Sequence, residues 1–326
     1  MSAVSTISQK PRILEQESRI KDLQAPKPTP QKLDPQLHKQ HQAEPLSQNL
    51  QDFISKKLVK YTTYSSALIN IISAPIHLFD DKNPIKKIIN SISMLFTKIH
   101  LGTYSVSGLI TALKQKNPFL VFSFLTEGLA AFLGLRKIYL FRGIATGTDG
   151  VVAGLKDKYK KSMFDSYADG WKFTLDSLKH SAKELYQKII KDPMHIFKLD
   201  GSDIAIFASL IAALGGFLGM TVNEKLFGAV RDIFGGLGDI GIFKLNNPLA
   251  KSSGFAYLSG TLMDLTARVF NKGIANILNI KDTNAFERLR DSFHEAAIAL
   301  DRIGSLLFLQ YQQESDKDLK LHAVKN

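Results

Sequence analysis

Residues 204–222 read IAIFASLIAALGGFLGMTV, an apolar stretch without charge between Asp203 and Glu224. At 1.5 Å per residue, a helix of this length extends about 28 Å, close to the hydrocarbon thickness of a bilayer. Gly215 and Gly219 are spaced as Gly-x-x-x-Gly, which lets a second helix approach closely. The stretch predicts a helix that spans or inserts deeply into a membrane. The alternative is the buried core helix of a soluble bundle.

Glycine also marks residues 138–155. Four glycines recur there every three or four residues: Gly143, Gly147, Gly150 and Gly154. On a helix they form one stripe, a groove into which a second backbone can press. We therefore expect a helix-packing surface, with a glycine-rich loop as the alternative. A nucleotide-binding loop does not fit, because the Gly-x-Gly and the Lys-Ser/Thr that such loops require are missing.

Further apolar segments continue in both directions along the chain. They cover residues 61–79, 85–113, 118–135 and 255–280, and a last amphipathic helix begins near Asn284. Residues 226–243 are so rich in glycine that they predict a short or broken helix. Together these segments predict an all-α fold of about eight helices, several of them apolar and membrane-inserting.

Residues 155–190 predict a helix of another kind. Apolar residues, including the single tryptophan Trp171, fall three to five positions apart, while the other positions carry many Lys, Asp and Glu residues. This segment is too highly charged to span a membrane. It either lies in a membrane interface or covers a helical bundle as a soluble amphipathic helix.

The two ends of the chain differ from its middle. Six of the 11 prolines precede residue 46, and no glycine precedes Gly102. A segment rich in Pro, Gln and Lys lacks the apolar surface that a folded core needs. We expect a disordered tail at residues 1–52, a helical membrane-associated body at 53–313 and a polar C-terminal tail at 314–326.

The net charge of +12 is spread along the chain rather than collected in one arm. Dispersed basic residues beside apolar segments favour an anionic lipid bilayer as partner. Self-association is a second expected partnership, and nucleic acid is disfavoured because no recognisable binding module is present. The absence of cysteine excludes disulfides, thiolate catalysis and Cys-based metal sites.

Three ionisable residues interrupt apolar segments: Glu127, Asp264 and Arg268. In a bilayer such residues are candidates for a functional path, whereas in a soluble bundle they lie on the surface. Asp264 and Arg268 are four residues apart, which predicts an ion pair on one helix. His294-Glu295 starts like a zinc-binding His-Glu-x-x-His motif, but Ile298 replaces the second histidine. We expect neither a catalytic residue nor a bound metal or cofactor.

The sequence leaves three functional hypotheses. The first is a non-enzymatic, oligomeric membrane protein that organises, shapes or permeabilises a bilayer. The second is a transporter or channel in which Glu127, Asp264 and Arg268 line a path. The third is a soluble helical interaction protein. The first two place the protein in a membrane, with the N-terminal tail on the cytosolic side.

Overall fold

The computed structural model describes residues 49–80, 82–132, 135–270 and 272–325. Most of the expected disordered tail, residues 1–48, lies outside the described residues. The backbone is already helical at Asn49 and continues through a π-helix, η3 (Phe53–Leu58), into the first long helix. The boundary expected between residues 52 and 53 therefore falls inside a helical stretch.

From Val59 to Lys325 the described residues form ten α-helices and no β-strand, so the all-α fold is confirmed and the expected number of eight was too low. The helices are α3 (Val59–Ile76), α4 (Pro84–Gln115), α5 (Pro118–Phe132), α6 (Leu135–Tyr159), α7 (Tyr167–Lys191), α8 (Gly201–Thr221), α9 (Glu224–Phe243), α10 (Pro248–Val269), α11 (Lys272–Ile277) and α12 (Thr283–Lys325). A short 3-10 helix, η4 (Pro193–Lys198), follows α7.

Among the described helices, α8 alone is long and apolar enough to cross a membrane by length and composition, whereas we expected several. The apolar helix α5 covers only 15 residues. The longer helices carry polar side chains at buried positions, such as His100 and Gln115 on α4, and these lower their hydropathy.

Side-chain caps fix where several helices begin. The Asn83 side chain accepts a hydrogen bond from the Ile85 N–H, and Pro84 occupies the first turn of α4. Before α8, the Asp200 carboxylate accepts from the Asp203 N–H at 2.7 Å. The start of α8 therefore lies close to the position that the sequence predicted.

The amphipathic helix expected over residues 155–190 is in fact interrupted. Helix α6 continues to Tyr159 and ends where Lys160 adopts a left-handed conformation, with φ of 53°. Helix α7 begins after Ser166, whose hydroxyl accepts from the Asp169 N–H at 3.1 Å and donates to the Asp169 carboxylate. This N-cap starts α7 separately from α6.

Two glycine-rich segments form uninterrupted helices. Helix α6 runs through its four glycines, which rules out the loop alternative there. Helix α9 covers 20 residues and is neither short nor broken, contrary to our expectation. A Cβ placed on Gly241 would lie 2.7 Å from the Ala205 Cα, so α9 and α8 are closely packed. This packing compensates for the low helix propensity of glycine.

The C-terminal third also departs from the expected boundaries. Helix α10 begins at Pro248 and ends at Val269, so the segment expected over 255–280 is divided between α10 and α11. Helix α12 is capped by the Asp282 carboxylate, which accepts from the Ala285 N–H at 2.9 Å. It continues to Lys325, past the polar tail expected from residue 314.

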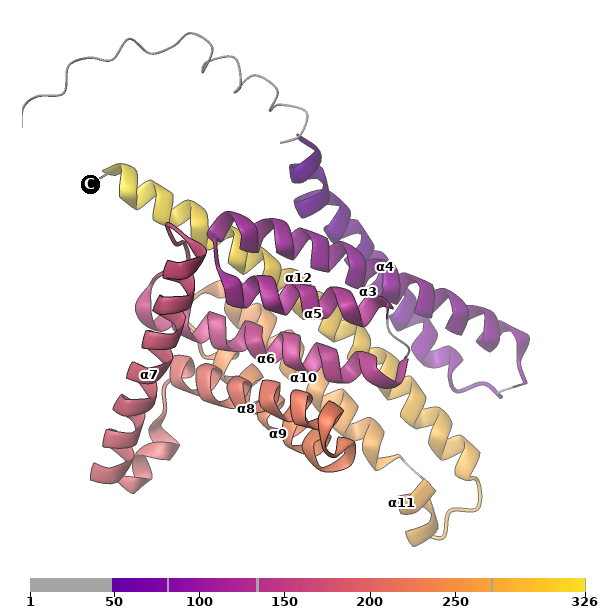
Figure 1. Ribbon diagram of the computed structural model, residues 1–326. Coiled ribbons are helices and arrows are strands. Elements are labelled where there is room, and N and C mark those ends of the chain that lie inside the picture. Colours follow the sequence, from indigo (N-terminus) through magenta and orange to yellow (C-terminus); the bar gives the residue numbers. More distant parts are fainter. Residues whose placement is uncertain (1–48, 81, 133–134, 271, 326) are drawn as a thin grey trace, which may run out of the picture. The chain divides into compact units, whose positions relative to one another are not determined.

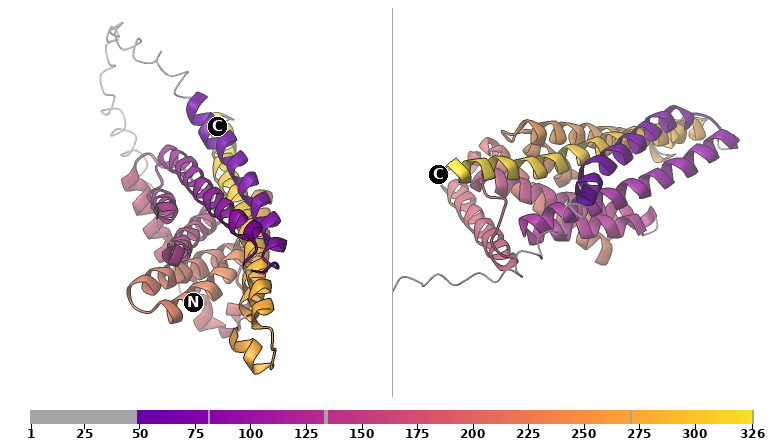
Figure 2. Two further views of the ribbon diagram at one scale, coloured as in Figure 1. Left: turned by 90° about the vertical axis from the view of Figure 1, so that its right-hand side faces the viewer. Right: turned by 90° about the horizontal axis from the view of Figure 1, so that it is seen from above.

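Contacts between helices follow a closed order: α3, α4, α5, α6, α8, α9, α10, α12 and again α3. Figure 1 shows these helices side by side, and Figure 2 shows α12 running along α3. Helix α7 lies outside this order and runs across the direction of α5 and α6. It touches the start of α5 through Gly170 and the end of α6 through a hydrogen bond between the Tyr159 and Ser181 hydroxyls.

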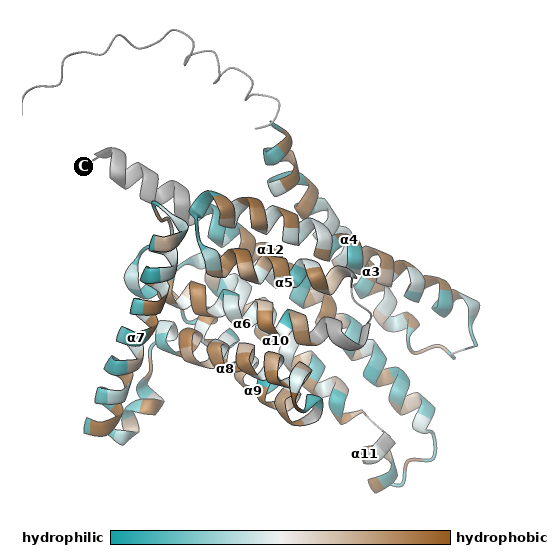
Figure 3. Cartoon of the chain, in the orientation of Figure 1, coloured by the Kyte–Doolittle hydropathy of each residue, from teal (hydrophilic) through white to brown (hydrophobic). Residues whose placement is uncertain are grey.

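Helix α3 has the opposite side-chain arrangement to a helix packed in water, because many of its buried side chains are polar and many of its exposed ones are apolar. Its buried positions are Val59, Thr63, Ser66, Ala67, Asn70, Ser73 and Ala74. Its exposed large apolar side chains are Tyr61, Tyr64, Leu68, Ile71 and Ile72. Helix α4 has the same character, because His100 and Gln115 are buried while Leu95 and Leu113 are exposed. Figure 3 shows apolar residues along α5 and α8 and a mixture of polar and apolar residues on α7.

Candidate functional site

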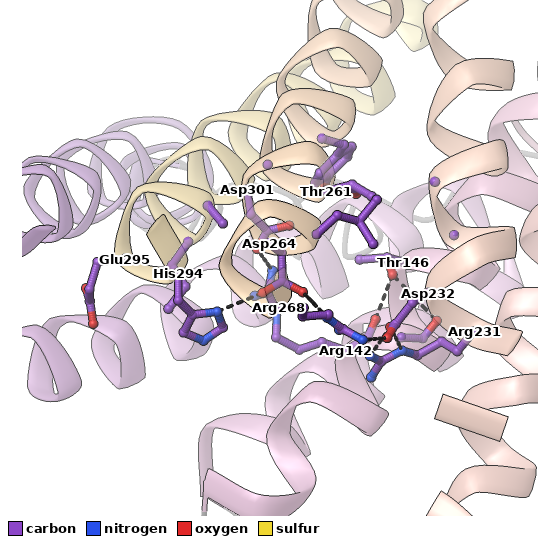
Figure 4. A pocket seen from close by; sticks show the side chains of 18 of the residues that line it. Arg142, Thr146, Arg231, Asp232, Thr261, Asp264, Arg268, His294, Glu295 and Asp301 are labelled. Carbon is purple, nitrogen blue, oxygen red and sulfur yellow. Dashed lines mark hydrogen bonds and ion pairs between the residues drawn. The ribbon is translucent and has the colours of Figure 1, made fainter. Parts of the chain in front are cut away.

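A cavity of about 970 Å³ lies among α4, α6, α9, α10 and α12. Its ionisable lining residues are His77, Arg142, Glu224, Arg231, Asp232, Asp239, Asp264, Arg268, His294, Glu295, Asp301 and Arg302. Figure 4 shows side chains of 18 lining residues, ten of them labelled, which come from separate helices. The volume is that of a pocket for a small molecule.

A first ionic cluster joins three helices beside the cavity. The Arg142 Nε on α6 donates to the Glu127 Oε1 on α5 at 3.0 Å, and the Arg142 Nη2 pairs with the Asp301 carboxylate on α12. Glu127 is 2% exposed, so its carboxylate depends on Arg142 for compensation of its charge. Deeper on α6, the Asp149 carboxylate accepts from the Ser123 hydroxyl at 2.6 Å.

A second cluster joins α9, α10 and α12 (Figure 4). The Arg268 Nη2 lies 2.9 Å from the Asp264 Oδ2, and the Arg268 Nη1 pairs with the Asp232 carboxylate. Asp232 also pairs with its neighbour Arg231. The His294 Nδ1 lies 2.8 Å from the other oxygen of Asp264. Each carboxylate of this cluster therefore faces at least one cationic or imidazole group.

A third group approaches the cavity from α3 and α4. The Glu295 Oε2 accepts from the Ser93 hydroxyl at 3.3 Å, and its Oε1 lies 3.7 Å from the His77 Nε2. Ser93 also lies 3.5 Å from the Asn70 Oδ1. These polar contacts connect the buried faces of α3 and α4 to α12.

The structure places the three ionisable candidates from the sequence around this one cavity. Asp264 and Arg268 line it and form the expected ion pair. Glu127 is not a lining residue, but it is hydrogen-bonded to Arg142, which is. Two of the three candidates therefore line the cavity, and the third is connected to it through Arg142.

Sequence reasoning overlooked the contribution of α12 to the cavity. Asp301 and Arg302 stand between Leu300 and Ile303 in a segment that is otherwise apolar. That adjacent charge pair was the available signal, because ionisable residues inside an apolar helix require burial with partners or an aqueous cavity. The sequence analysis predicted this segment only as the last amphipathic helix.

The stripe of glycines on α6 lies mainly against α8. A Cβ on Gly147 would be 2.7 Å from the Ser209 carbonyl oxygen, and one on Gly154 would be 2.7 Å from the Ser202 carbonyl oxygen. A Cβ on Gly150 would overlap the Ser209 side chain. These three glycines allow the two backbones to approach closely.

The remaining packing candidates have different neighbours. Gly143 lines the cavity and faces the Arg231 side chain of α9. A Cβ on Gly215 would lie 2.9 Å from the Arg231 backbone nitrogen, and one on Gly219 would lie 3.0 Å from the Leu140 side chain of α6. Glycines of α6 and α8 thus position α6, α8 and α9 at one side of the cavity.

Comparison with protein-family models, with curated proteins and with solved structures gave no significant match. Within the described residues, no group of three or more His, Asp or Glu side chains is arranged to hold a metal ion. The cavity itself supplies alternating positive and negative groups in a confined space. Such a lining can orient a polar or ionic solute.

Proposed function

We propose that this chain forms a membrane-inserted helical bundle whose ionic cavity takes up a small polar solute, as in a transporter or a channel. The observation that supports this most directly is the cavity of about 970 Å³ lined by paired charges inside a bundle with outward-facing apolar side chains. In bilayer proteins, ionisable residues face the bundle interior or a water-filled cavity and mark solute pathways.

The outward apolar residues support lipid as the surrounding medium. Every square ångström of apolar surface left in water forgoes about 25 cal/mol of burial free energy. On α3, side chains such as Leu68 and Ile72 are exposed while Asn70 between them is buried. This pattern is unfavourable in water but favourable in hydrocarbon, where the apolar side chains meet lipid and the polar ones find partners within the protein.

Helix α8 fits the same proposal. It has the length and composition of a span, and 44% of its most apolar window is buried inside the protein. A helix at the wall of a bundle has one buried face and one lipid-facing side. Its exposed residues Leu214 and Phe217 would contact lipid, while Ser209 and Gly216 pack inward.

Membrane fractionation tests the proposed insertion. Membranes from cells that express the full chain are washed with alkaline carbonate, and the protein is expected to stay in the pellet until detergent is added. Release by carbonate would indicate a peripheral protein, and recovery without detergent would favour the soluble interaction protein. Either result would overturn the proposal. Protease access to the N-terminal tail in sealed vesicles tests its expected cytosolic side.

A second candidate function, the organisation or permeabilisation of a bilayer, is favoured by the surface of α7 and η4. Trp171, Tyr186, Ile190 and Met194 are exposed there, on a segment that also carries many lysines. An exposed apolar face with adjacent basic residues suits the interface of an anionic bilayer. Because Trp171 is the single tryptophan, its quenching by brominated lipids reports the depth of α7 directly.

Liposome experiments separate the two candidates. A transporter or selective channel should move a solute across the bilayer while an entrapped bulky dye is retained. A permeabilising protein should release the dye, more strongly from anionic than from neutral vesicles. Release of the dye would favour bilayer organisation over the transport proposal.

A further inference from the structure

One cationic side chain of the cavity differs from the others. Four arginines line the cavity, and Arg142, Arg231 and Arg268 each pair with a carboxylate. The fourth, Arg302, is 2% exposed, and its Nε and Nη1 have no hydrogen-bond partner. Arg302 is also among the largest fully buried side chains in the described part of the chain.

Burying Arg302 in this way destabilises the folded protein when no ligand is bound. Arginine stays protonated in proteins, and a buried charge without a hydrogen-bonded partner is strongly unfavourable. The carboxylates of Glu127 and Asp301 both pair with Arg142, although the Oε2 of Glu127 has no hydrogen-bond partner. In this arrangement neither the Nε nor the Nη1 of Arg302 is hydrogen-bonded to a carboxylate of the protein.

The chemistry of the guanidinium group specifies the missing partner. Its planar fork of N–H donors matches the paired oxygens of a carboxylate or phosphate, and such bidentate contacts are short and strong. Among the other acidic lining residues, Asp232 and Asp264 pair with Arg268, and Asp239 accepts from the Thr261 hydroxyl. The group that Arg302 itself lacks is a negatively charged hydrogen-bond acceptor.

We propose that Arg302 anchors the oxyanion group of a small organic anion in the cavity, which makes such anions the solute class of the proposed transporter or channel. This inference rests on the proposed function for its biological meaning. The ligand carries a carboxylate or a phosphate group on a body small enough for about 970 Å³. Arg142 and Arg268, held by their carboxylates, line the rest of the cavity without supplying the anchor.

The test uses the full-length protein purified in detergent. Its thermal unfolding is followed with succinate as the carboxylate probe and inorganic phosphate as the phosphate probe, with sodium chloride at matched ionic strength as reference. We expect succinate, phosphate or both to raise the melting temperature in a saturable way. The probe that acts assigns the ligand to carboxylates, phosphates or oxyanions in general.

Two substitutions of Arg302 separate its effect on stability from its effect on binding. Arg302→Met removes the uncompensated charge, so it should leave the melting temperature without probe unchanged or raised, while the affinity for the probe falls about 10- to 100-fold. Arg302→Lys keeps the charge without the fork and should bind with intermediate affinity. Arg290→Gln removes a partly exposed arginine from the same helix and should bind as the parent does.

Several results would overturn the inference. One is that neither probe stabilises the folded parent, and another is that Arg302→Met binds the probe unchanged. A third is that Arg302→Met lowers the melting temperature sharply without probe, which would show that Arg302 is paired inside the protein. None of these results bears on carbonate extraction, so failure of this inference is distinguishable from failure of the proposed membrane insertion.

Discussion

Helices α7 and α8 are neighbours in the chain and expose apolar side chains to the same extent, yet they are held in different ways. Leu175 on α7 is 54% exposed and Leu214 on α8 is 52% exposed. Helix α8 packs against α6 and α9 through glycines, alanines and Ser209, with backbone close to backbone. Helix α7 contacts the end of α6 and the start of α5 through small polar residues, through the aromatic pairs Tyr159–Phe173 and Phe119–Trp171, and through a charged contact.

The charges around these exposed residues distinguish the two environments. Helix α8 carries no charge after Asp203, whereas α7 carries lysines and carboxylates along its length. A charge-free exposed surface suits the hydrocarbon interior of a bilayer, and a mixed one suits its interface with water. Under the proposed membrane insertion, the neighbouring charges therefore assign the exposed side of α8 to the hydrocarbon and that of α7 to the interface.

The largest expected difference between the helices comes from placing a charge on each exposed surface. Leu214→Arg should cost about 2.5–3.5 kcal/mol of insertion free energy and shift the protein out of the carbonate-resistant pellet. Leu175→Arg, equally exposed, should change stability by no more than about 0.5 kcal/mol and leave the protein in the pellet. The two variants are compared by fractionation and by steady-state abundance. Equal behaviour would remove the distinction between the helices.

The next prediction tests how closely each helix is packed against its neighbours. Gly147→Leu forces a side chain against the Ser209 carbonyl oxygen of α8 and should cost about 3 kcal/mol in unfolding free energy. Gly170→Leu on α7 meets the Lys116 carbonyl oxygen equally closely, at 2.6 Å for its Cβ. It should cost less than half as much, because α7 is free to shift away from the bundle.

Gly102→Leu on α4 is the control for added bulk, since a Cβ there has no neighbour within 4 Å. Leucine is the better helix former, so this variant should match or exceed the parent in stability. Unfolding in detergent, followed by circular dichroism, gives all three values. If Gly147→Leu were as stable as Gly102→Leu, the close contact between α6 and α8 would be absent in solution.

The contrast between α7 and α8 also marks what the sequence could predict. The stretch 204–222 predicted α8 to within three residues at its start and one at its end, because a charge-free stretch has few alternative structures and Asp200 caps its start. Helix α7 begins 12 residues, more than three helical turns, after the start predicted for it at residue 155. Apolar spacing continues from α6 across the break, which the left-handed Lys160 and the Ser166 cap produce.

The candidate site was predictable only in part, for a reason of distance along the chain. Asp264 and Arg268 could be paired because their spacing is local. The partnership of Glu127, Arg142 and Asp301 depends on three helices that meet only in the folded bundle. Local periodicity holds no information about which of these charges share a partner.

A third prediction concerns Lys158, a side chain of α6 that contacts both α7 and α8. The Lys158 ammonium donates to the Asp203 carboxylate of α8 at 2.7 Å and lies 2.9 Å from the Glu184 carboxylate of α7. Asp203 is 2% exposed, so Lys158→Met leaves a buried carboxylate without this partner and should cost about 2 kcal/mol. Thermal unfolding measures the loss.

The double variant Lys158→Met with Asp203→Asn separates the contact of Lys158 with Asp203 from its contact with Glu184. Removing the charge of Asp203 should recover most of the lost stability, because the unpaired buried charge accounts for the larger share of the cost. If the double variant is less stable than Lys158→Met, the link to α7 through Glu184 is the dominant interaction. That outcome would make α7 a more integral part of the bundle than its few contacts indicate.

The smallest expected effect concerns Glu184 itself and depends on pH. Hydrogen bonds from the Lys188 and Lys158 ammonium groups lower the pKa of Glu184 to about 2, from 4.5 for an ordinary glutamate. Since the folded pKa is below the unfolded one, the contribution to stability is present above about pH 4.5 and is lost as the pH falls toward 2. For a partly exposed pair the contribution is about 0.2–1 kcal/mol.

Glu184→Gln should therefore weaken the docking of α7 at pH 7 and match the parent near pH 2. The fluorescence of Trp171 reports α7 in particular, because no other tryptophan contributes to it. Asp176→Asn removes an exposed carboxylate of the same helix and is the control for a change of net charge. It should show no comparable convergence with the parent at low pH. A difference between Glu184→Gln and the parent that stays constant from pH 7 to pH 2 would mean that Lys158 holds α7 through its aliphatic stem rather than through its charge. In that case α7, like α8, would be bound to the bundle mainly by contacts other than ion pairs. Charge would then no longer distinguish how the two helices are held.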